Sequence, residues 1–195
     1  MKSPKFHRWF QRIAIRAVRF TFKLLYGYRV VGKENVPNEA CIIVPNHTQN
    51  SDPCFVMAAI GDRVPFCAMA KKELFEIPLL NRLFVWIGGF PVDRSRADMT
   101  AIKTALRAVQ DGTSLLIFPQ GTRGSEDTAA KSGAAMLAVR TKAPVLPVYL
   151  PGNKKLWCRP HVVIGQPYYP EQTRDYDKVA EDMMQRIYAL RGEVE

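Results

Sequence analysis

The sequence predicts an α/β protein, a single layered domain with a largely parallel central sheet flanked by helices and preceded by a basic amphipathic N-terminal helix. Two observations lead to this prediction. From residue 28 onward, short apolar runs alternate with helical patterns. Before that point the chain is uniformly basic, because residues 1–33 contain nine Lys and Arg and no acid. We therefore divide the 195 residues into an N-terminal helix at 1–27 and one folded domain at 28–195.

The N-terminal helix is expected to have two distinct stripes. Basic residues recur every three or four positions, at Arg8, Arg12, Arg16, Arg19 and Lys23. Apolar residues face largely away from them, at Phe6, Phe10, Ile13, Ala17, Phe20 and Leu24. Such a helix can lie in an anionic membrane interface, where each basic residue contributes on the order of 1 kcal/mol. The alternative is a first helix whose apolar stripe packs on the protein's own core.

The remaining elements follow in an alternating order. Strands are expected at 28–31, 41–44, 65–69, 90–92, 114–118, 145–150 and 161–164. Helices are expected at 53–60, 77–87, 97–110, 131–140 and 175–190. In sheets of this kind ligands gather outside the carboxyl ends of the strands, so functional residues are sought there.

Net charge and cysteine usage limit the possible partners and compartments. A net charge of +10 implies a polyanionic partner, which could be nucleic acid, an anionic membrane or a phosphorylated substrate. The four cysteines form no CxxC pair, and the apolar surroundings of Cys41, Cys54 and Cys67 suggest buried thiols rather than a metal site or disulfides. A reducing, cytosol-facing location is therefore expected. No run of about 18 apolar residues predicts a transmembrane helix, and no cleavable signal pattern is expected.

One expected strand ends in a histidine followed five residues later by an aspartate. His47 and Asp52 lie in the stretch PNHTQNSDP, where Asp52 before Pro53 could simply cap a helix. Across a tight turn, however, the carboxylate could reach the imidazole and fix its tautomer. The other ring nitrogen would then be free to take a proton from a hydroxyl. His47 is therefore a candidate general base.

Three further strand ends have residues that a buried core would not need. The second, GGFPVDRS, contains Arg94, which suits bidentate phosphate binding or an ion pair with Asp93. The third, FPQGTRG, offers a close backbone approach at Gly121, a hydroxyl at Thr122 and a guanidinium at Arg123. The fourth contains Pro147, which cannot donate to a sheet ladder and so predicts an irregular strand near an edge.

These four blocks, in this order, resemble the glycerolipid acyltransferase family that includes the 1-acylglycerol-3-phosphate (lysophosphatidic acid) acyltransferases. Its first motif, NH followed by four residues and Asp, matches Asn46, His47 and Asp52. Residues 89–94 match the second motif, and residues 145–148 match the apolar fourth motif with its central proline. The third motif, FPEGTR, matches residues 118–123 except that Gln120 replaces Glu. The resemblance covers about residues 28–168, so 28–195 is interpreted as an acyltransferase domain.

The resemblance implies transfer of a fatty acyl group from acyl-CoA or acyl carrier protein to a lysophospholipid hydroxyl, giving phosphatidic acid when the acceptor is 1-acylglycerol-3-phosphate. It implies that His47 is the base and that Asp52 orients it. The acceptor's phosphate would be held by Arg94, Gly121, Thr122 and Arg123, with Lys72 as a further candidate. Gln120 would also bind the substrate. The thioester is a co-substrate, and no cofactor, metal or nucleic acid is implied. The protein would be peripheral, on the cytoplasmic face of an anionic membrane.

Gln120 and the net charge leave alternatives open. Gln can accept and donate hydrogen bonds but cannot balance an arginine's charge, so Gln120 could favour a dianionic phosphate acceptor. The acceptor could instead be a lysophospholipid with a larger headgroup, or a lyso-aminolipid. The protein could also be a non-catalytic membrane lipid-binding protein or a nucleic-acid binder. The last fits poorly, because the aromatics of the N-terminal helix lie away from its arginines.

Overall fold

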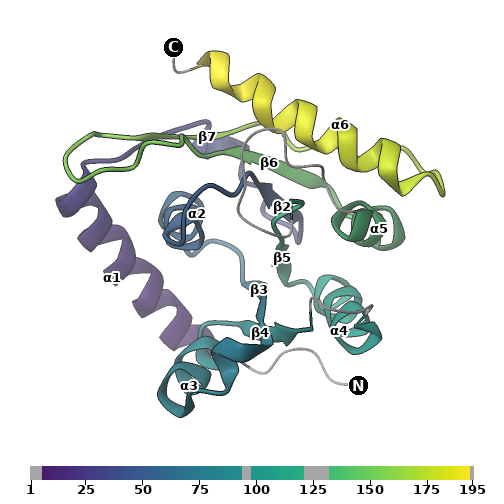
Figure 1. The fold of residues 1–195 in the computed structure, drawn as a ribbon, viewed down its shortest axis with the longest axis horizontal. Helices are drawn as coiled ribbons and strands as arrows, with labels where there is room; N and C mark the ends of the chain where they lie inside the picture. Colours follow the sequence, from purple (N-terminus) through teal and green to yellow (C-terminus); the bar gives the residue numbers. More distant parts are fainter. Residues whose placement is uncertain (1–5, 94–97, 121–131, 194–195) are drawn as a thin grey trace.

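The computed structural model describes residues 6–93, 98–120 and 132–193, which form a central sheet with helices on both faces (Figure 1). The sheet has seven strands in the order β1-β7-β6-β2-β5-β3-β4. The strands are β1 (Arg29–Val31), β2 (Ile42–Pro45), β3 (Phe66–Lys71), β4 (Gly89–Val92), β5 (Ser114–Leu116), β6 (Val145–Tyr149) and β7 (His161–Ile164). The helices are α1 (Arg8–Tyr26), α2 (Asp52–Ile60), α3 (Pro78–Trp86), α4 (Met99–Gln110), α5 (Ser132–Thr141) and α6 (Tyr176–Ala189). Short 3-10 helices are η1 (Lys33–Asn35), η2 (Lys72–Phe75) and η3 (Leu190–Glu193).

Strand direction confirms the prediction of a largely parallel α/β sheet. Within the described sheet, neighbouring strands are parallel except β6 and β7, which pair antiparallel through Val148 with Ile164 and Tyr149 with Val163. The central strand β2 lies between β6 and β5, with Ile42 opposite both Val145 and Leu115. Parallel pairing brings the carboxyl ends of five strands to one edge of the sheet. We call this the carboxyl edge; it begins with the residues that follow those strands, Asn46, Lys72, Asp93, Ile117 and Leu150.

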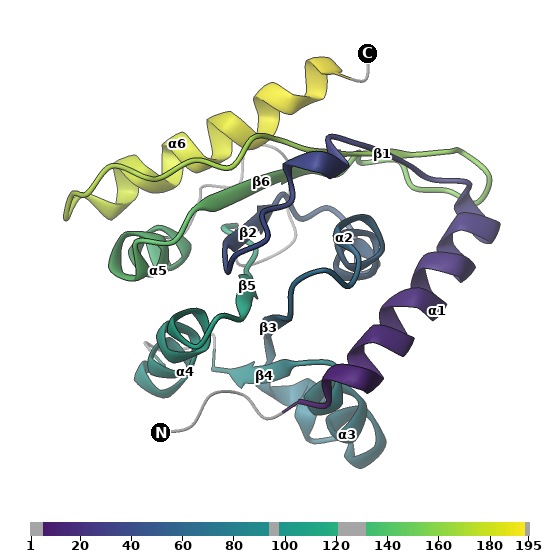
Figure 2. The same ribbon diagram turned by 180° about the vertical axis from the view of Figure 1, so that it is seen from behind.

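Two apolar layers hold the helices to the sheet, which explains why β2 is apolar at consecutive positions. Side chains alternate between the two faces of a strand. Ile42 and Val44 pack with α4, α5 and α6, whereas Ile43 packs with α1 and α2 on the other face. Figures 1 and 2 show the same arrangement, with α1 lying along α2 and away from α4, α5 and α6. Because the sheet is covered on both faces, its central strands need no polar alternation.

Helix α1 has a different packing face from the apolar stripe that the sequence suggested. Gln11 and Ile15 are buried, and Val18, Phe22 and Tyr26 pack against the same core. Of the predicted apolar stripe, by contrast, Ile13, Phe20 and Leu24 are 57%, 72% and 58% exposed. The alternative in which that stripe packs on the protein's own core is therefore wrong for these three residues. The helix has one apolar face on the core and another that faces outward.

Pro147 corrects another expectation, because it does not lie on an edge strand. β6 is flanked by β7 and β2, Pro147 pairs with Val44, and β6 is buried throughout. The carbonyl of Pro147 accepts a hydrogen bond from Gly165 N at 3.0 Å. Because the nitrogen and the carbonyl of a strand residue point to the same side, the nitrogen of Pro147 also faces the chain that follows β7. There the regular ladder with β7 has already ended after Val148 and Tyr149. The missing donor is thus tolerated inside the sheet because its neighbour on that side is irregular.

Candidate active site

The site is built on a rigid connection between the carboxyl ends of β2 and β6. Asn46, directly after β2, donates from Nδ2 to the carbonyl of Leu150 at 2.8 Å, and its Oδ1 accepts from Leu150 N at 2.7 Å. Asn46 is buried, and both polar ends of its amide are satisfied by the backbone of Leu150, directly after β6. This pairing fixes where the chain leaves the sheet, one residue before His47.

His47 and Asp52 meet across the turn between β2 and α2, as the five-residue spacing predicted. His47 Nδ1 lies 2.9 Å from Asp52 Oδ2, and the aspartate is fully buried. The same oxygen accepts backbone hydrogen bonds from Thr48 N at 2.6 Å and Gln49 N at 2.7 Å. Asp52 therefore organises the turn that precedes it, while Ser51 occupies the N-cap position of α2. The proximity is confirmed, and the catalytic role of the pair stays a prediction.

The second oxygen of Asp52 faces a buried lysine. Lys154, in the loop after β6, places Nζ 2.9 Å from Asp52 Oδ1, and both side chains are inaccessible to solvent. Its ammonium also donates to Thr48 Oγ1 at 2.7 Å and to the carbonyl of Pro151 at 2.5 Å. A buried ammonium is stable only when its donors are paired, and here three oxygens surround it. Lys154 thus ties the His47 turn to the loop after β6.

The electrostatic environment keeps Asp52 ionised. Burial alone raises the pKa of this carboxyl, but hydrogen bonds from His47 and Gln49 and the charge of Lys154 outweigh it and hold the pKa below its usual value. Burial likewise lowers the pKa of Lys154, against the opposing influence of Asp52. We therefore treat the two groups as a buried ion pair with His47 hydrogen-bonded to its anionic member.

Gln120 and Phe118, from the segment after β5, complete the surroundings of His47. Gln120 is buried; its Oε1 accepts from the backbone N of His47 at 2.7 Å, and its Nε2 lies 3.3 Å from Tyr188 Oη on α6. The centroid of the Phe118 ring lies 4.2 Å from the centroid of the His47 imidazole, and the two ring planes are tilted by 32°. Gln120 therefore acts on the His47 backbone in this structure, and its contact with a substrate stays a prediction.

The predicted phosphate-binding residues are only partly within the described chain. Lys72, after β3, lies 2.8 Å from Asp93 Oδ2, after β4. Both follow strands that end at the carboxyl edge, as does His47. Arg94, Gly121, Thr122 and Arg123 lie outside the described residues. The ion pair suggested between Asp93 and Arg94 is likewise outside them, whereas the one between Asp93 and Lys72 is present.

Two contributors to the site were not predicted from the sequence. Lys154 stands beside Lys155 in the stretch PGNKKLW, and only the structure shows that the first is buried and the second exposed. Tyr188 lies on α6, about 70 residues from Gln120, in an ordinary amphipathic pattern. A buried-lysine role could have been suspected only from its place four residues after a predicted strand end.

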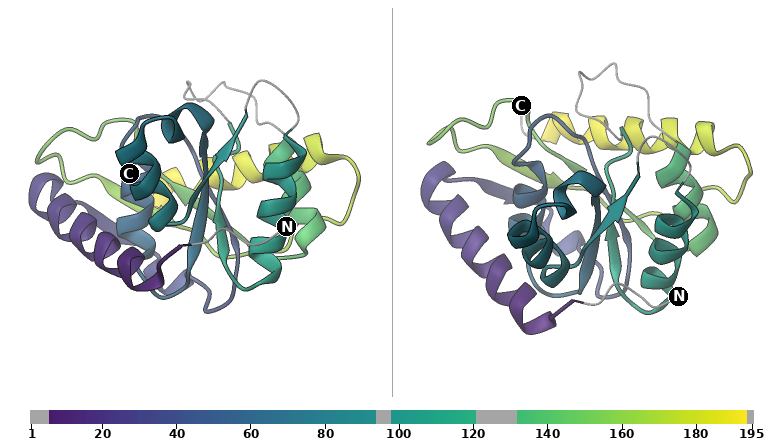
Figure 3. Two further views of the ribbon diagram at one scale, coloured as in Figure 1. Left: turned by 90° about the horizontal axis from the view of Figure 1, so that it is seen from below. Right: turned by 60° about the horizontal axis from the view of Figure 1, so that its bottom comes forward.

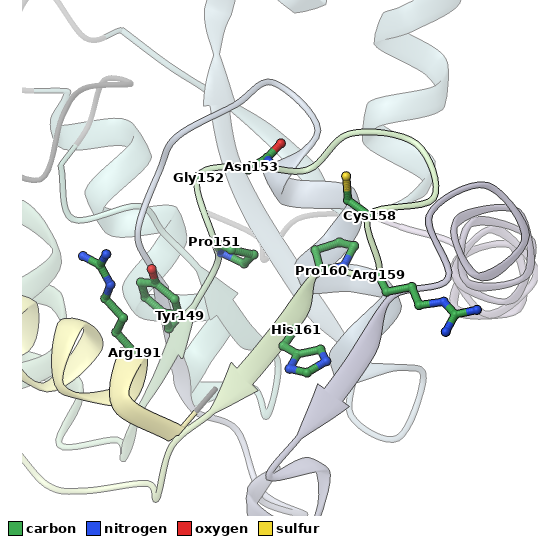
Figure 4. Close-up of a pocket in the computed structure, with 9 residues that line it drawn as sticks. All are labelled: Tyr149, Pro151, Gly152, Asn153, Cys158, Arg159, Pro160, His161 and Arg191. Atoms are coloured by element: carbon green, nitrogen blue, oxygen red, sulfur yellow. The ribbon is translucent and has the colours of Figure 1, made fainter. Parts of the chain in front are cut away.

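A cavity of about 440 Å³ lies beside this site at the carboxyl edge, between the loop after β6, the start of β7 and η3 (Figure 4). Its wall includes Pro151, whose carbonyl accepts from Lys154, and Gly152, whose carbonyl accepts from Gln49 Nε2 at 3.0 Å. His161 and Arg191 also line it, while the side chain of Arg159 runs toward α1 and away from His161 (Figure 4). Among the residues described, no helix is both long and apolar enough to cross a membrane.

The fold and the site place the chain among α/β proteins that pair a histidine with a buried aspartate at the carboxyl edge of a largely parallel sheet. More specifically, the chain belongs to the acyltransferase family, because the family model described as Acyltransferase matches residues 27–151. This match includes His47, Asp52 and Gln120, and it ends at Pro151, before Lys154.

Individual relatives agree with this assignment. The 1-acyl-sn-glycerol-3-phosphate acyltransferase of Bacillus subtilis (strain 168) is 31% identical over 166 residues, covering 81% of this chain and 82% of that protein. The protein of the same name from Streptococcus pneumoniae (strain ATCC BAA-255 / R6) is 36% identical over 130 residues, covering 63% and 47%. The chain thus spans most of the first relative and about half of the second.

A solved structure shares the fold. The crystal structure of the 1-acyl-sn-glycerophosphate (LPA) acyltransferase PlsC from Thermotoga maritima superposes with a TM-score of 0.71 at 21% identity, covering 95% of this chain and 82% of that one. This similarity includes the α/β core and confirms the predicted architecture.

Proposed function

We propose that this protein transfers a fatty acyl group from a thioester, acyl-CoA or acyl carrier protein, to the free hydroxyl of 1-acylglycerol-3-phosphate, giving phosphatidic acid at an anionic membrane surface. The observation that carries the proposal is the 2.9 Å contact between His47 Nδ1 and Asp52 Oδ2 at the carboxyl edge. The acceptor is suggested by the names of the relatives from Bacillus subtilis and Streptococcus pneumoniae.

His47 acts as the general base in the proposed reaction. With Nδ1 held by Asp52, Nε2 takes the proton from the acceptor hydroxyl while its oxygen attacks the thioester carbonyl. The tetrahedral intermediate then collapses, the carbon–sulfur bond breaks, and the imidazolium returns the proton to the leaving thiolate. The products are phosphatidic acid and the free thiol of the donor. Asp52 stabilises the transient imidazolium by its charge.

Direct attack by the acceptor needs no cysteine nucleophile, and the thiols of Cys41, Cys54 and Cys67 suit that mechanism. Burial raises the pKa of Cys41 to about 11 and that of Cys67 to about 12, so neither is a thiolate at neutral pH. Burial also raises the pKa of Cys54. A covalent acyl-cysteine intermediate at these three positions is therefore disfavoured.

The acceptor's phosphate would bind at the carboxyl edge, where the predicted basic residues follow the strands. Arg94 and the segment Gly121, Thr122 and Arg123 are proposed to hold it, since Arg offers a fork of donors matched to phosphate. Lys72 follows a strand that ends at the same edge and is a further candidate. These assignments rest on the sequence motifs.

The outward face of α1 is proposed to lie in the membrane interface. Trp9, Ile13, Phe20 and Leu24 are all more than half exposed, and the helix carries basic residues beside them. An exposed apolar face flanked by arginines suits an anionic bilayer surface better than water. The lipid acceptor would then be supplied by the surface on which the enzyme lies.

Release of free thiol from acyl-CoA or acyl carrier protein by the purified protein tests the proposal, with and without 1-acylglycerol-3-phosphate in vesicles. Acceptor-dependent release is expected from the wild type. It should fall by about 10² to 10⁴ in His47→Ala, because a positioned general base contributes about that much. In Asp52→Asn the rate of acceptor-dependent thiol release should fall by a factor within the same range.

His7→Ala is the matched control, because it removes a histidine that packs against Trp86 and does not line the cavity beside the site, and its rate should equal that of the wild type. Absence of thiol release from the wild type with either donor would contradict the proposed activity. Release that requires another lysophospholipid or a lyso-aminolipid would retain the chemistry and change the acceptor.

A further inference from the structure

The loop between β6 and β7 ends in an exposed apolar tip. Leu156 is 56% exposed and Trp157 is 69% exposed. We call these two residues the 156–157 tip. It lies next to the C-terminal end of α1, where Leu24 and Leu25 are also exposed, and both segments lie at the same end of the molecule (Figure 3). Within the described residues, more than half of each of these two apolar side chains is open to water.

The tip is held in place by the backbone of α1. Trp157 N donates to the carbonyl of Leu25 at 3.0 Å, and Arg159 N donates to the carbonyl of Tyr26 at 3.0 Å. Both residues adopt left-handed backbone conformations, with φ of 64° at Trp157 and 50° at Arg159. Such conformations are unfavourable for residues other than glycine, and they persist where surrounding contacts enforce them. The fold therefore holds the backbone of the tip in this conformation at an energetic cost.

The charges around the tip have one sign. Residues 150–166 contain no acid, and Lys155 and Arg159 are exposed on either side of the tip. The neighbouring residues 1–33 also contain no acid. A tryptophan with basic neighbours is the composition found at the level of lipid headgroups, where the ring is partly apolar and its N–H still finds a partner. The expected occupant of this surface is thus an anionic bilayer.

We propose that the 156–157 tip is a second membrane contact, entering the interfacial region of the bilayer beside the outward face of α1. The inference rests on the membrane surface included in the proposed function. It also orients the enzyme, because Lys154, only two residues before Leu156, forms an ion pair with Asp52. The tip and the His47 turn are therefore one connected unit, and the carboxyl edge faces the lipid that supplies the acceptor.

Single-tryptophan variants of the full chain test the inference, because the protein has three tryptophans. Trp9→Phe with Trp86→Phe leaves Trp157 as the reporter of the tip. Trp86→Phe with Trp157→Phe leaves Trp9 as the reporter of α1. Each is mixed with phosphatidylglycerol vesicles that contain brominated phosphatidylcholine. We expect a blue shift and bromine quenching of Trp157 as well as of Trp9.

A matched control comes from the opposite edge of the sheet. Tyr169 is 65% exposed, close to the value for Trp157, and it follows β7, which runs antiparallel to β6. In a protein whose three tryptophans are changed to Phe, Tyr169→Trp should show no quenching. Quenching of Trp9 without Trp157 would overturn the tip contact and leave the membrane part of the proposed function standing. If neither tryptophan is quenched, both fail.

Two further measurements do not depend on replacing the half-buried Trp86. Changing Leu156 and Trp157 together to Ser should weaken vesicle affinity about tenfold, since burying one large apolar side chain is worth roughly that factor or more. Tyr169→Ser should leave the affinity unchanged.

The second measurement uses an environment-sensitive label on the exposed thiol of Cys158, in a chain that also has Cys54→Ala. Cys41 and Cys67 are buried and so are not expected to take the label. The fluorescence of the label should increase on vesicles. An unchanged label signal with vesicle-bound protein would contradict the tip contact.

Discussion

Lys154 Nζ lies 2.9 Å from Asp52 Oδ1, and both side chains are fully buried. The other oxygen of the same carboxylate receives His47 Nδ1 and two backbone N–H groups. Asp52 is thus the centre of a polar cluster that joins the turn after β2 to the loop after β6. A buried ion pair gains stability only when its remaining donors and acceptors are also satisfied, which Thr48 and Pro151 accomplish for the lysine.

Lys154→Met should destabilise the protein by about 3 to 5 kcal/mol, because removing one partner leaves the other charge buried and uncompensated. Urea unfolding at neutral pH measures this loss. Lys155→Met is the matched control, since Lys155 is exposed and exposed substitutions stay within about 0.5 kcal/mol. Equal midpoints for the two variants would show that the ion pair contributes little.

The depressed pKa of Asp52 predicts how its contribution to stability depends on pH. A carboxyl whose folded pKa lies below its unfolded value stabilises the fold above the unfolded pKa of about 3.9, and this contribution is lost as pH falls through the folded pKa. Asp52→Asn has no such titration. The wild type should therefore be the more stable protein near pH 7, and the difference should narrow below about pH 4. Unfolding free energies at a series of pH values check this, and a constant difference down to pH 2 would contradict it.

Gly32 lies where β1 meets the end of β7, and any side chain at this position is expected to lower the stability of the protein. It has φ of 72°, and a Cβ there would overlap the carbonyl oxygen of Ile164. Gly112 also has a positive φ, 82°, but an added Cβ would meet nothing within 4 Å. Gly112→Ala should cost about 1 to 2 kcal/mol for its left-handed backbone alone. Gly32→Ala should cost about 1 to 3 kcal/mol more, as a forced steric clash does. Thermal unfolding of both variants gives the comparison, and equal losses would mean that the backbone at Gly32 moves freely.

The parallel sheet could be predicted because each strand and each helix is marked by a pattern within its own short stretch of sequence. Apolar runs such as 41–44 alternate with helical patterns, and strands buried on both faces produce such runs. The turn holding His47 and Asp52 could be predicted for the same reason, since five residues of spacing limit how far the two side chains can separate. Near Pro147 the local rule failed, because its missing donor falls opposite an irregular segment that follows β7.

The rest of the site depends on contacts between distant segments. Lys154 and Asp52 are separated by about 100 residues, and no periodicity distinguishes a buried lysine from the exposed one next to it. The sequence also does not show which of the two apolar faces of α1 is buried. Ile15 and Ile13 are equally apolar, and only the position of α2 determines that the first is buried and the second exposed.

Gln120 stands where the family motif has Glu, and its hydrogen bonds predict that the two are interchangeable. The acceptor that His47 N requires is an oxygen, which Gln and Glu both provide, and Tyr188 Oη can donate to a carboxylate. Gln120→Glu should therefore keep kcat/KM within about fivefold, less than 1 kcal/mol in the barrier. Gln120→Met has a similar length but no acceptor, so the buried N–H of His47 loses its partner at a cost of about 1 to 3 kcal/mol. Its kcat should fall about tenfold or more.

Steady-state rates with 1-acylglycerol-3-phosphate and with a larger-headgroup lysophospholipid also show whether Gln120 favours a dianionic phosphate. If Gln120→Glu loses as much activity as Gln120→Met, the charge at this position matters more than the hydrogen bond, and an unchanged preference between the two acceptors would remove the motive for a role in selecting them.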